Sequence, residues 1–172
     1  MRTAPGSGSS TNEIFGLRRG DTTLVPLVTS PAADLFPALS PDARWLAYGS
    51  DESGTMEIYV RPFPETSTAK WQVSTNGGTQ PVWSKSGRQL YYIDGKNNLV
   101  SADIRPGATF AVGEQRALFS FSPFLRLGPI PSFDVSADDR RFVVVREGEA
   151  TQQSELIVAE HWLEGLKGKG GR

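Results

Sequence analysis

The chain contains no cysteine and only one histidine, and these two scarcities exclude several classes of function. Without cysteine there is no disulfide framework, no thiolate zinc site and no cysteine nucleophile. A Ser-His-Asp triad would depend on His161 alone, and no Gly-x-Ser-x-Gly nucleophile elbow occurs. The motifs of phosphoryl-transfer enzymes are missing as well. We therefore expect the chain to be non-catalytic.

A strong charge of either sign and long apolar runs are also absent. The 172 residues include 18 Lys and Arg against 19 Asp and Glu, a net charge of -1, which gives no electrostatic case for nucleic-acid binding. No run is long and apolar enough to insert in a membrane. The acidic pairs Asp51-Glu52 and Asp138-Asp139 lack the oxygen spacing of a calcium loop, so we expect no metal and no other cofactor.

A short motif, Ser followed four residues later by Arg, occurs three times. Its copies are Ser40 and Arg44, Ser84 and Arg88, and Ser136 and Arg140, with serines 44 and then 52 residues apart. This period is typical of one four-stranded propeller blade. Each copy lies between two apolar runs and has turn chemistry, since Ser and Asp side chains can accept from nearby backbone N–H groups. We expect Asp42 and Asp138, like the serines and arginines of the motif, to form turns.

Apolar residues resume at the same two offsets after each motif. The pairs are Leu46 and Tyr48, Leu90 and Tyr92, and Phe142 and Val144. This alternation predicts a second strand with the same face buried in every copy. Further apolar runs at 56–60, 98–102 and 155–159 predict third strands, and 71–74 and 116–120 predict fourth strands. Only 160–167 favours a terminal turn or two of helix.

The repeat predicts an all-β fold, a partial β-propeller of four-stranded antiparallel blades. A linker over 1–11, without the apolar segment of a secretory signal, precedes the propeller at 12–167, and a flexible tail follows at 168–172. The propeller divides into outer strands of a preceding blade at 12–28 and blades at 34–74, 79–120 and 130–160. About half a ring leaves apolar sheet faces open, so we expect either the tail of a longer gene product or pairing of two copies.

Several stretches together resemble a known repeat. They are Phe36-Pro37-Ala38-Leu39-Ser40-Pro41-Asp42-Ala43-Arg44-Trp45-Leu46-Ala47-Tyr48, Asp51-Glu52-Ser53-Gly54 and Ile58-Tyr59-Val60-Arg61-Pro62-Phe63-Pro64. The chain resembles the TolB-like, WD40-like (PD40) β-propeller repeat over 12–167. More narrowly, it is similar to the C-terminal propeller of bacterial eukaryotic-like serine/threonine protein kinases, whose usual tail the stretch 156–167 resembles. The second and third hinges depart from the Pro-Asp-Gly that the family tends to have.

The resemblance implies more than the residues alone establish. It implies a periplasmic or cell-surface location, with a kinase domain and a membrane helix upstream, whereas the chain itself leaves the compartment unknown. Any kinase or peptidase activity would lie outside this chain.

Antiparallel blades send the blade-to-blade connections and the turns between second and third strands to one end, where we expect ligands to bind. The candidate contact residues are Phe121, Phe124, Leu125, Arg126, Asp51 and Asn97. Packing of the segment 121–129 on the last blade is an equally weighted alternative. We expect binding of a protein, a peptide or a small ligand, in the manner of a sensor. The alternatives are a gating propeller of a prolyl-oligopeptidase-like hydrolase, and a structural module that self-associates through open blade edges.

Overall fold

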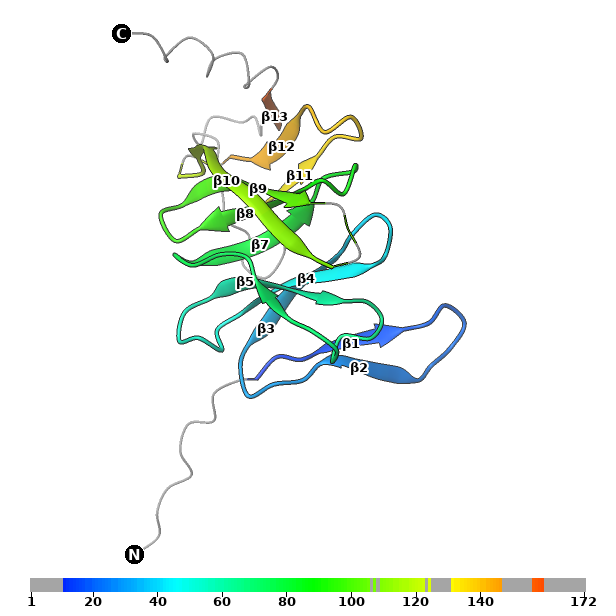
Figure 1. Cartoon of the computed structure of the whole chain (residues 1–172). Helices are drawn as coiled ribbons and strands as arrows, with labels where there is room; N and C mark the ends of the chain where they lie inside the picture. Colours follow the sequence, from blue (N-terminus) through cyan, green and yellow to red (C-terminus); the bar gives the residue numbers. More distant parts are fainter. Residues whose placement is uncertain are drawn as a thin grey trace, which may run out of the picture.

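The computed structural model describes residues 11–105, 107, 109–122, 124, 131–146 and 156–159. Within these residues all regular secondary structure is β, arranged in four antiparallel sheets. The sheets follow one another in chain order, from the strands of the N-terminal region to those of the C-terminal region (Figure 1). The molecule is thus an open, partial β-propeller, which confirms the predicted fold class. The predicted terminal helix at 160–167, His161 and the tail lie outside the described residues.

Each sheet is a simple meander in which neighbours along the chain pair. The first sheet holds β1 (Ile14–Leu17) and β2 (Leu24–Val28). The second holds β3 (Asp34–Leu39), β4 (Trp45–Ser50), β5 (Glu57–Pro62) and β6 (Trp71–Gln72). The third holds β7 (Gly78–Trp83), β8 (Gln89–Asp94), β9 (Asn98–Arg105) and β10 (Ala111–Ser120). The fourth holds β11 (Phe133–Val135), β12 (Phe142–Val145) and β13 (Leu156–Ala159).

One pair of hydrogen bonds closes the hinge between the first and second strands of the last three sheets. The Ser40 N–H donates to the Trp45 carbonyl at 2.9 Å, and the Ser40 hydroxyl oxygen accepts from the Trp45 N–H at 3.0 Å. Ser84 makes both bonds with Gln89, and Ser136 makes both with Arg141, at the same distances. The serine therefore acts as a side-chain extension of the ladder and fixes where each strand turns.

Aspartate reinforces two of these three hinges. The Ser40 hydroxyl donates to the Asp42 carboxylate at 2.6 Å, and the Ser136 hydroxyl donates to Asp138. These bonds to the ionised form lower the pKa of both carboxyl groups. Asp42 and Asp138 also accept from the N–H groups of Arg44 and Arg140.

The residues that repeat after each hinge face the preceding sheet. Leu46 and Tyr48 pack toward β1 and β2, Leu90 and Tyr92 toward the second sheet, and Phe142 and Val144 toward the third. The intervening residues of β4 and β8, such as Ala47 and Ile93, face the following sheet. Central strands are consequently buried on both sides, and each buried aliphatic or aromatic side chain contributes about 1.5–3 kcal/mol.

Both ends of the row of sheets leave apolar side chains exposed. Phe15 and Leu17 lie on the opposite face of β1 from buried Ile14, and Leu17 pairs with Leu24 of β2; all three are more than two-fifths exposed. Val143 and Val145 of β12 are exposed at the other end. These are the faces that a further blade would cover in a closed ring.

Ala43 offers a direct test of the hinge geometry. It has a φ of 53°, while Gly87, at the same place in the next hinge, has a φ of 70°. Because a side chain strains this left-handed region, Ala43→Gly should stabilise the protein by about 0.5–1 kcal/mol, after the extra entropy of glycine in the unfolded chain is subtracted. Urea unfolding measures the change. The control Ala47→Gly, in a buried strand, should destabilise, and a destabilising Ala43→Gly would contradict the assigned backbone.

The buried tyrosines make stability depend on alkaline pH. Burial raises the pKa of Tyr91 and Tyr92 to about 12, above the value of about 10 expected in the unfolded chain. The folded state thus favours the neutral phenol, so this stability is fully present below pH 10 and is lost between about pH 10 and 12. Unfolding midpoints measured across this range should fall. Tyr91→Phe keeps the ring that packs on Phe142 and should reduce the fall; an unchanged pH dependence would contradict the assignment.

Candidate functional site

Hydrogen bonds tie the blade-to-blade connections to the turns of the following sheet at one end of the molecule. The Ala33 N–H donates to the Asp51 carboxylate at 2.8 Å, which joins the first connection to the β4–β5 turn. The Gly95 N–H donates to the Asn76 carbonyl at 3.0 Å, which joins the second connection to the β8–β9 turn. Connections and turns therefore meet at the same end, where the sequence places ligand binding.

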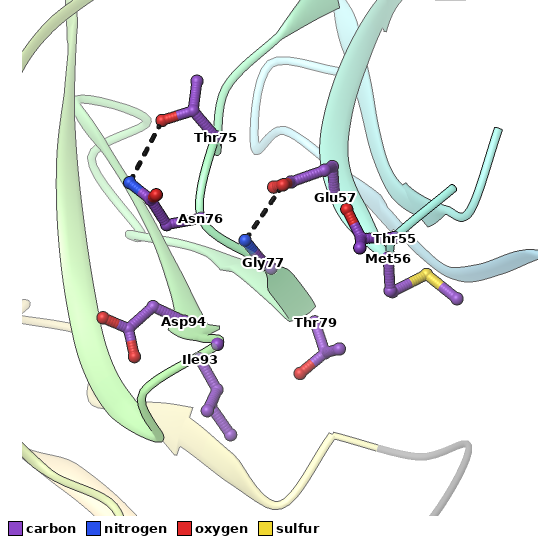
Figure 2. A pocket seen from close by; sticks show the side chains of 11 residues that line it. Thr55, Met56, Glu57, Thr75, Asn76, Gly77, Thr79, Ile93 and Asp94 are labelled. Atoms are coloured by element: carbon purple, nitrogen blue, oxygen red, sulfur yellow. Dashed lines mark hydrogen bonds between the residues drawn. The ribbon is translucent and has the colours of Figure 1, made fainter. Parts of the chain in front are cut away.

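A cavity of about 470 Å³ opens at this end, between the second and third sheets (Figure 2). Three segments form it: the start of β5, the connection from β6 to β7, and the end of β8. Its lining consists of Thr55, Met56, Glu57, Thr75, Asn76, Gly77, Gly78, Thr79, Ile93, Asp94 and Gly95. We refer to it as the loop-end pocket.

Glu57 is the buried charge of the loop-end pocket, with only 3% of its surface exposed. One carboxylate oxygen accepts from the Gly77 N–H at 2.9 Å, and the other accepts from the Ser74 hydroxyl. The Ser74 oxygen in turn accepts from the Ile58 N–H at 2.8 Å. A charge from β5 thus holds the connection that forms the pocket wall, through hydrogen bonds stronger than neutral ones.

Glycine residues let this connection lie so close to neighbouring atoms that no side chain would fit between them. A Cβ on Gly78 would lie 2.3 Å from the Ser74 oxygen, and a Cβ on Gly95 would lie 2.4 Å from the Asn76 carbonyl oxygen. Gly77 has a φ of +84° and also approaches Gly95 closely. Larger residues at these positions would push the connection away from β5 and from the β8–β9 turn, so the shape of the pocket depends on the absence of side chains.

The lining carries two carboxylates, Glu57 and Asp94, and no basic side chain. Asp94 is fixed by its own turn, because its carboxylate accepts from the N–H groups of Lys96 and Asn98 and from the Asn98 side-chain amide. Glu57 contributes negative charge from below the surface, and the partly exposed Asp94 is the carboxylate that a ligand can reach. Among the described residues, no group of three or more metal-ligating side chains is positioned to hold an ion.

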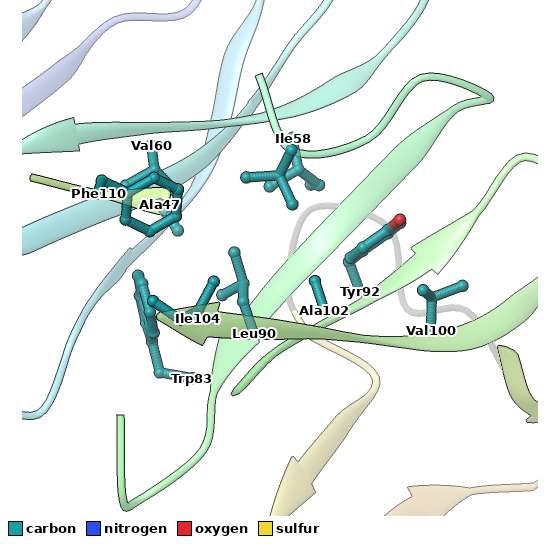
Figure 3. Close-up of a cluster of buried hydrophobic side chains, with 11 residues drawn as sticks. Ala47, Ile58, Val60, Trp83, Leu90, Tyr92, Val100, Ala102, Ile104 and Phe110 are labelled. Carbon is teal, nitrogen blue, oxygen red and sulfur yellow. The ribbon is translucent and has the colours of Figure 1, made fainter. Parts of the chain in front are cut away.

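The two sheets that flank the pocket are held together by a cluster of buried side chains (Figure 3). Ile58 and Val60 of β5 contribute from one side, and Leu90 of β8 contributes from the other. The Trp83 indole N–H crosses the interface and donates to the Ala38 carbonyl at 3.0 Å. Since Ile58 follows Glu57 directly, the carboxylate is positioned by a rigid strand.

Two of the residues expected to contact a ligand, Asp51 and Asn97, hold turns and connections in the structure. Asp51 accepts from the Ala33 N–H, as described above. Asn97 has a φ of 61° in the β8–β9 turn, and its side-chain amide donates to the Ser122 hydroxyl at 3.2 Å. Neither residue lines the loop-end pocket.

Phe121 is fully buried in the core between the third and fourth sheets, where it cannot contact a ligand. Its ring lies 5.2 Å from that of Phe124 and 5.8 Å from that of Phe133, measured between centroids. Phe124 is half-buried and packs against the same cluster. The placement of these two rings matches the alternative in which the segment packs on the last blade, because both rings cover the apolar residues between the third and fourth sheets. Leu125 and Arg126 lie outside the described residues.

The sequence predicts ligand binding at the loops around the pocket, but its candidate residues are not those that line the pocket. The sequence pattern places Glu57 only within a mainly apolar strand run. A signal for it is present, since Glu57 directly precedes three apolar residues, Ile58, Tyr59 and Val60, of a buried strand. The adjacent glycines Gly77 and Gly78 were a second signal, because such a pair indicates close approach of backbone segments.

Solved structures resemble this chain at low sequence identity. A protein described as TolB, from Agrobacterium tumefaciens, matches with a TM-score of 0.59 and 14% identity, over 88% of this chain and 54% of that one. The fold is a TolB-like β-propeller. Oligogalacturonate lyase from Vibrio parahaemolyticus matches with a TM-score of 0.53 and 15% identity, over 87% of this chain and 41% of that one.

A further structure, an oligogalacturonate lyase in complex with manganese, matches with a TM-score of 0.51 and 15% identity, over 84% of this chain and 39% of that one. The chain thus spans about half the length of these proteins or less. No protein-family model matches it, and no curated protein does. Within the described part of the chain, none of the elements is a helix that could span a lipid bilayer.

Removal of the Glu57 carboxylate tests its role in holding the pocket wall. Glu57→Ala leaves the Gly77 N–H and the Ser74 hydroxyl without their acceptor, and should lower the free energy of unfolding by about 2 kcal/mol. Urea unfolding measures the loss. Glu65→Ala, an exposed glutamate in the β5–β6 loop, is the control and should change stability by less than about 0.5 kcal/mol. Equal effects of the two substitutions would contradict the assigned role.

Proposed function

We propose that this chain is a non-catalytic propeller segment that binds a peptide, a protein or a small ligand at the loop-end pocket. The observation that carries the proposal is the pocket itself, which lies where one blade-to-blade connection and two turns converge at the packed interface between two sheets. Its volume of about 470 Å³ falls in the range of ligand sites. Loops positioned by a rigid scaffold are the common location of such sites.

The charge of the lining selects among ligands. Asp94 provides acceptors, Glu57 adds buried negative charge, and no basic side chain lines the pocket, so a ligand with N–H donors or a positive amine is favoured over an anion. A peptide N-terminus carries both features. The exposed threonines Thr55 and Thr75 add hydroxyl groups at the rim.

We further propose that the chain is the C-terminal part of a larger receptor-like kinase or TolB-like protein, in which it acts as the sensor. The motif resemblance supports this context, and so does the match to about half of a TolB structure. Any phosphoryl transfer would be performed by another part of that protein.

Assembly is a second candidate function, favoured by the exposed apolar residues of the first sheet. Phe15, Leu17 and Leu24 form a surface that would gain by burial against another blade, either of the same protein or of a second copy. Native mass measurement of the purified chain distinguishes this role, because a stable monomer at high concentration would contradict self-association.

Binding of short peptides tests the loop-end pocket. In 1H–15N spectra of the full chain, tripeptides with free N-termini should shift the resonances of Gly77, Gly78 and Gly95, and their N-acetylated counterparts should bind more weakly. Thr55→Arg places a cation at the rim and should weaken peptide binding by about tenfold.

The matched control is Thr109→Arg, which introduces the same charge in the exposed β9–β10 turn, outside the pocket. It should leave peptide affinity unchanged. No shift of the three glycines with any peptide, or equal loss in both variants, would contradict the proposal.

A further inference from the structure

The hinge end of the molecule, opposite the loop-end pocket, contains a cleft of about 220 Å³ between the first and second hinges. Its lining includes three arginines, Arg44, Arg88 and Arg105. Arg44 and Arg88 occupy the same position of the repeated motif, and Arg105 ends β9. Three separate segments therefore bring guanidinium groups to one cleft, which we call the hinge cleft.

The positive charge of the hinge cleft is largely uncompensated. Asp42 is the one carboxylate in the lining, and it already accepts from the Ser40 hydroxyl and the Arg44 N–H. Arg88 and Arg105 make no ion pair within 4.0 Å with any carboxylate of the described residues. The local excess of positive charge differs from the near-neutral balance of the whole chain.

Arg44 is the best oriented of the three arginines. One guanidinium nitrogen donates to the Gly107 carbonyl at 3.2 Å, and the group lies 5.4 Å from the centre of the Trp45 ring, which also lines the cleft. These two contacts limit its rotamers and leave its other N–H groups for a ligand.

The junction between the second and third hinges holds an internal carboxylate. There the Asp139 carboxylate accepts from the N–H groups of Lys85 and Ser86, at 2.5 and 3.0 Å. Asp139 stands three residues after Ser136 with a φ of 58°. The equivalent residue of the second hinge is Gly87, which lines the hinge cleft and has no side chain. The third hinge thus places a carboxylate on the second hinge, whereas Gly87 has no carboxylate to place on the first. At the first hinge Pro41 stands at the position of Lys85 and has no N–H, so an anion there would depend on the arginines.

We propose that the hinge cleft binds a small anionic ligand through phosphate or carboxylate groups, with Arg44, Arg88 and Arg105 as the contact residues. Guanidinium groups bind both oxyanions with paired, charge-assisted hydrogen bonds. The site lies at the opposite end of the sheets from the loop-end pocket and has the opposite charge. It is therefore independent of the function proposed above.

Titration of the full chain with inorganic phosphate and, separately, with citrate tests the site at constant ionic strength. The side-chain Nε–Hε resonances of Arg88 and Arg105 should shift with at least one of the two anions. Arg88→Gln and Arg105→Gln should each weaken binding by about tenfold, the loss expected for one charged hydrogen-bonding group. A response to phosphate alone indicates a site for phosphate groups, and a response to citrate alone indicates a site for carboxylate groups.

The matched control is Arg116→Gln, which removes an arginine of β10 that lies outside the cleft, near Asp103 and Glu114. This variant should bind as the unmodified chain does. Absence of binding by both anions, or equal weakening in all three variants, would overturn the proposal. Each variant's unfolding midpoint is compared with that of the unmodified chain, and the arginine resonances of the unmodified chain decide the question if a variant fails to fold.

Discussion

The structure depends on one constraint, the burial of central strands on both of their faces. β4 and β8 send alternate residues to the sheet before and the sheet after, so neither face can be exposed to water without a large loss of apolar burial. The sheets must therefore stack in sequence, and the stacking fixes the distance between the loops at either end. Both candidate binding regions lie at junctions between sheets, and their shapes follow from this packing.

At the loop-end pocket, apolar packing joins the two sheets, and polar groups satisfy the backbone of the connection between them. Apolar contacts bring β5 and β8 together, but the connection between the sheets is irregular backbone with donors to satisfy. The buried Glu57 carboxylate accepts from this connection, and the absence of side chains at Gly77, Gly78 and Gly95 lets it lie against the next turn. The same acidic group that satisfies the loop also sets the polarity of the pocket.

The fold could be predicted from the sequence because its determinants are local and repeated. Ser40, Ser84 and Ser136 mark the hinges, and the paired offsets after them identify which residues face the preceding sheet. The pocket was harder to predict, since it depends on which backbone segments of different sheets touch. Phe121 illustrates the difficulty, because an aromatic residue in a loop suits both ligand contact and core packing, and only the neighbouring rings Phe124 and Phe133 distinguish the two. Asp51 similarly has a carboxylate that could serve a ligand or a loop, and its partner, Ala33, is 18 residues away.

The left-handed position of each hinge has an evolutionary consequence. Ala43, Gly87 and Asp139 occupy it in turn, and the codons for alanine, glycine and aspartate can differ at the second base alone. A single nucleotide substitution can therefore remove the carboxylate from such a junction without altering the path of the chain. Repeated hinges can therefore differ in whether a junction carries its own carboxylate, while the strands on either side remain the same.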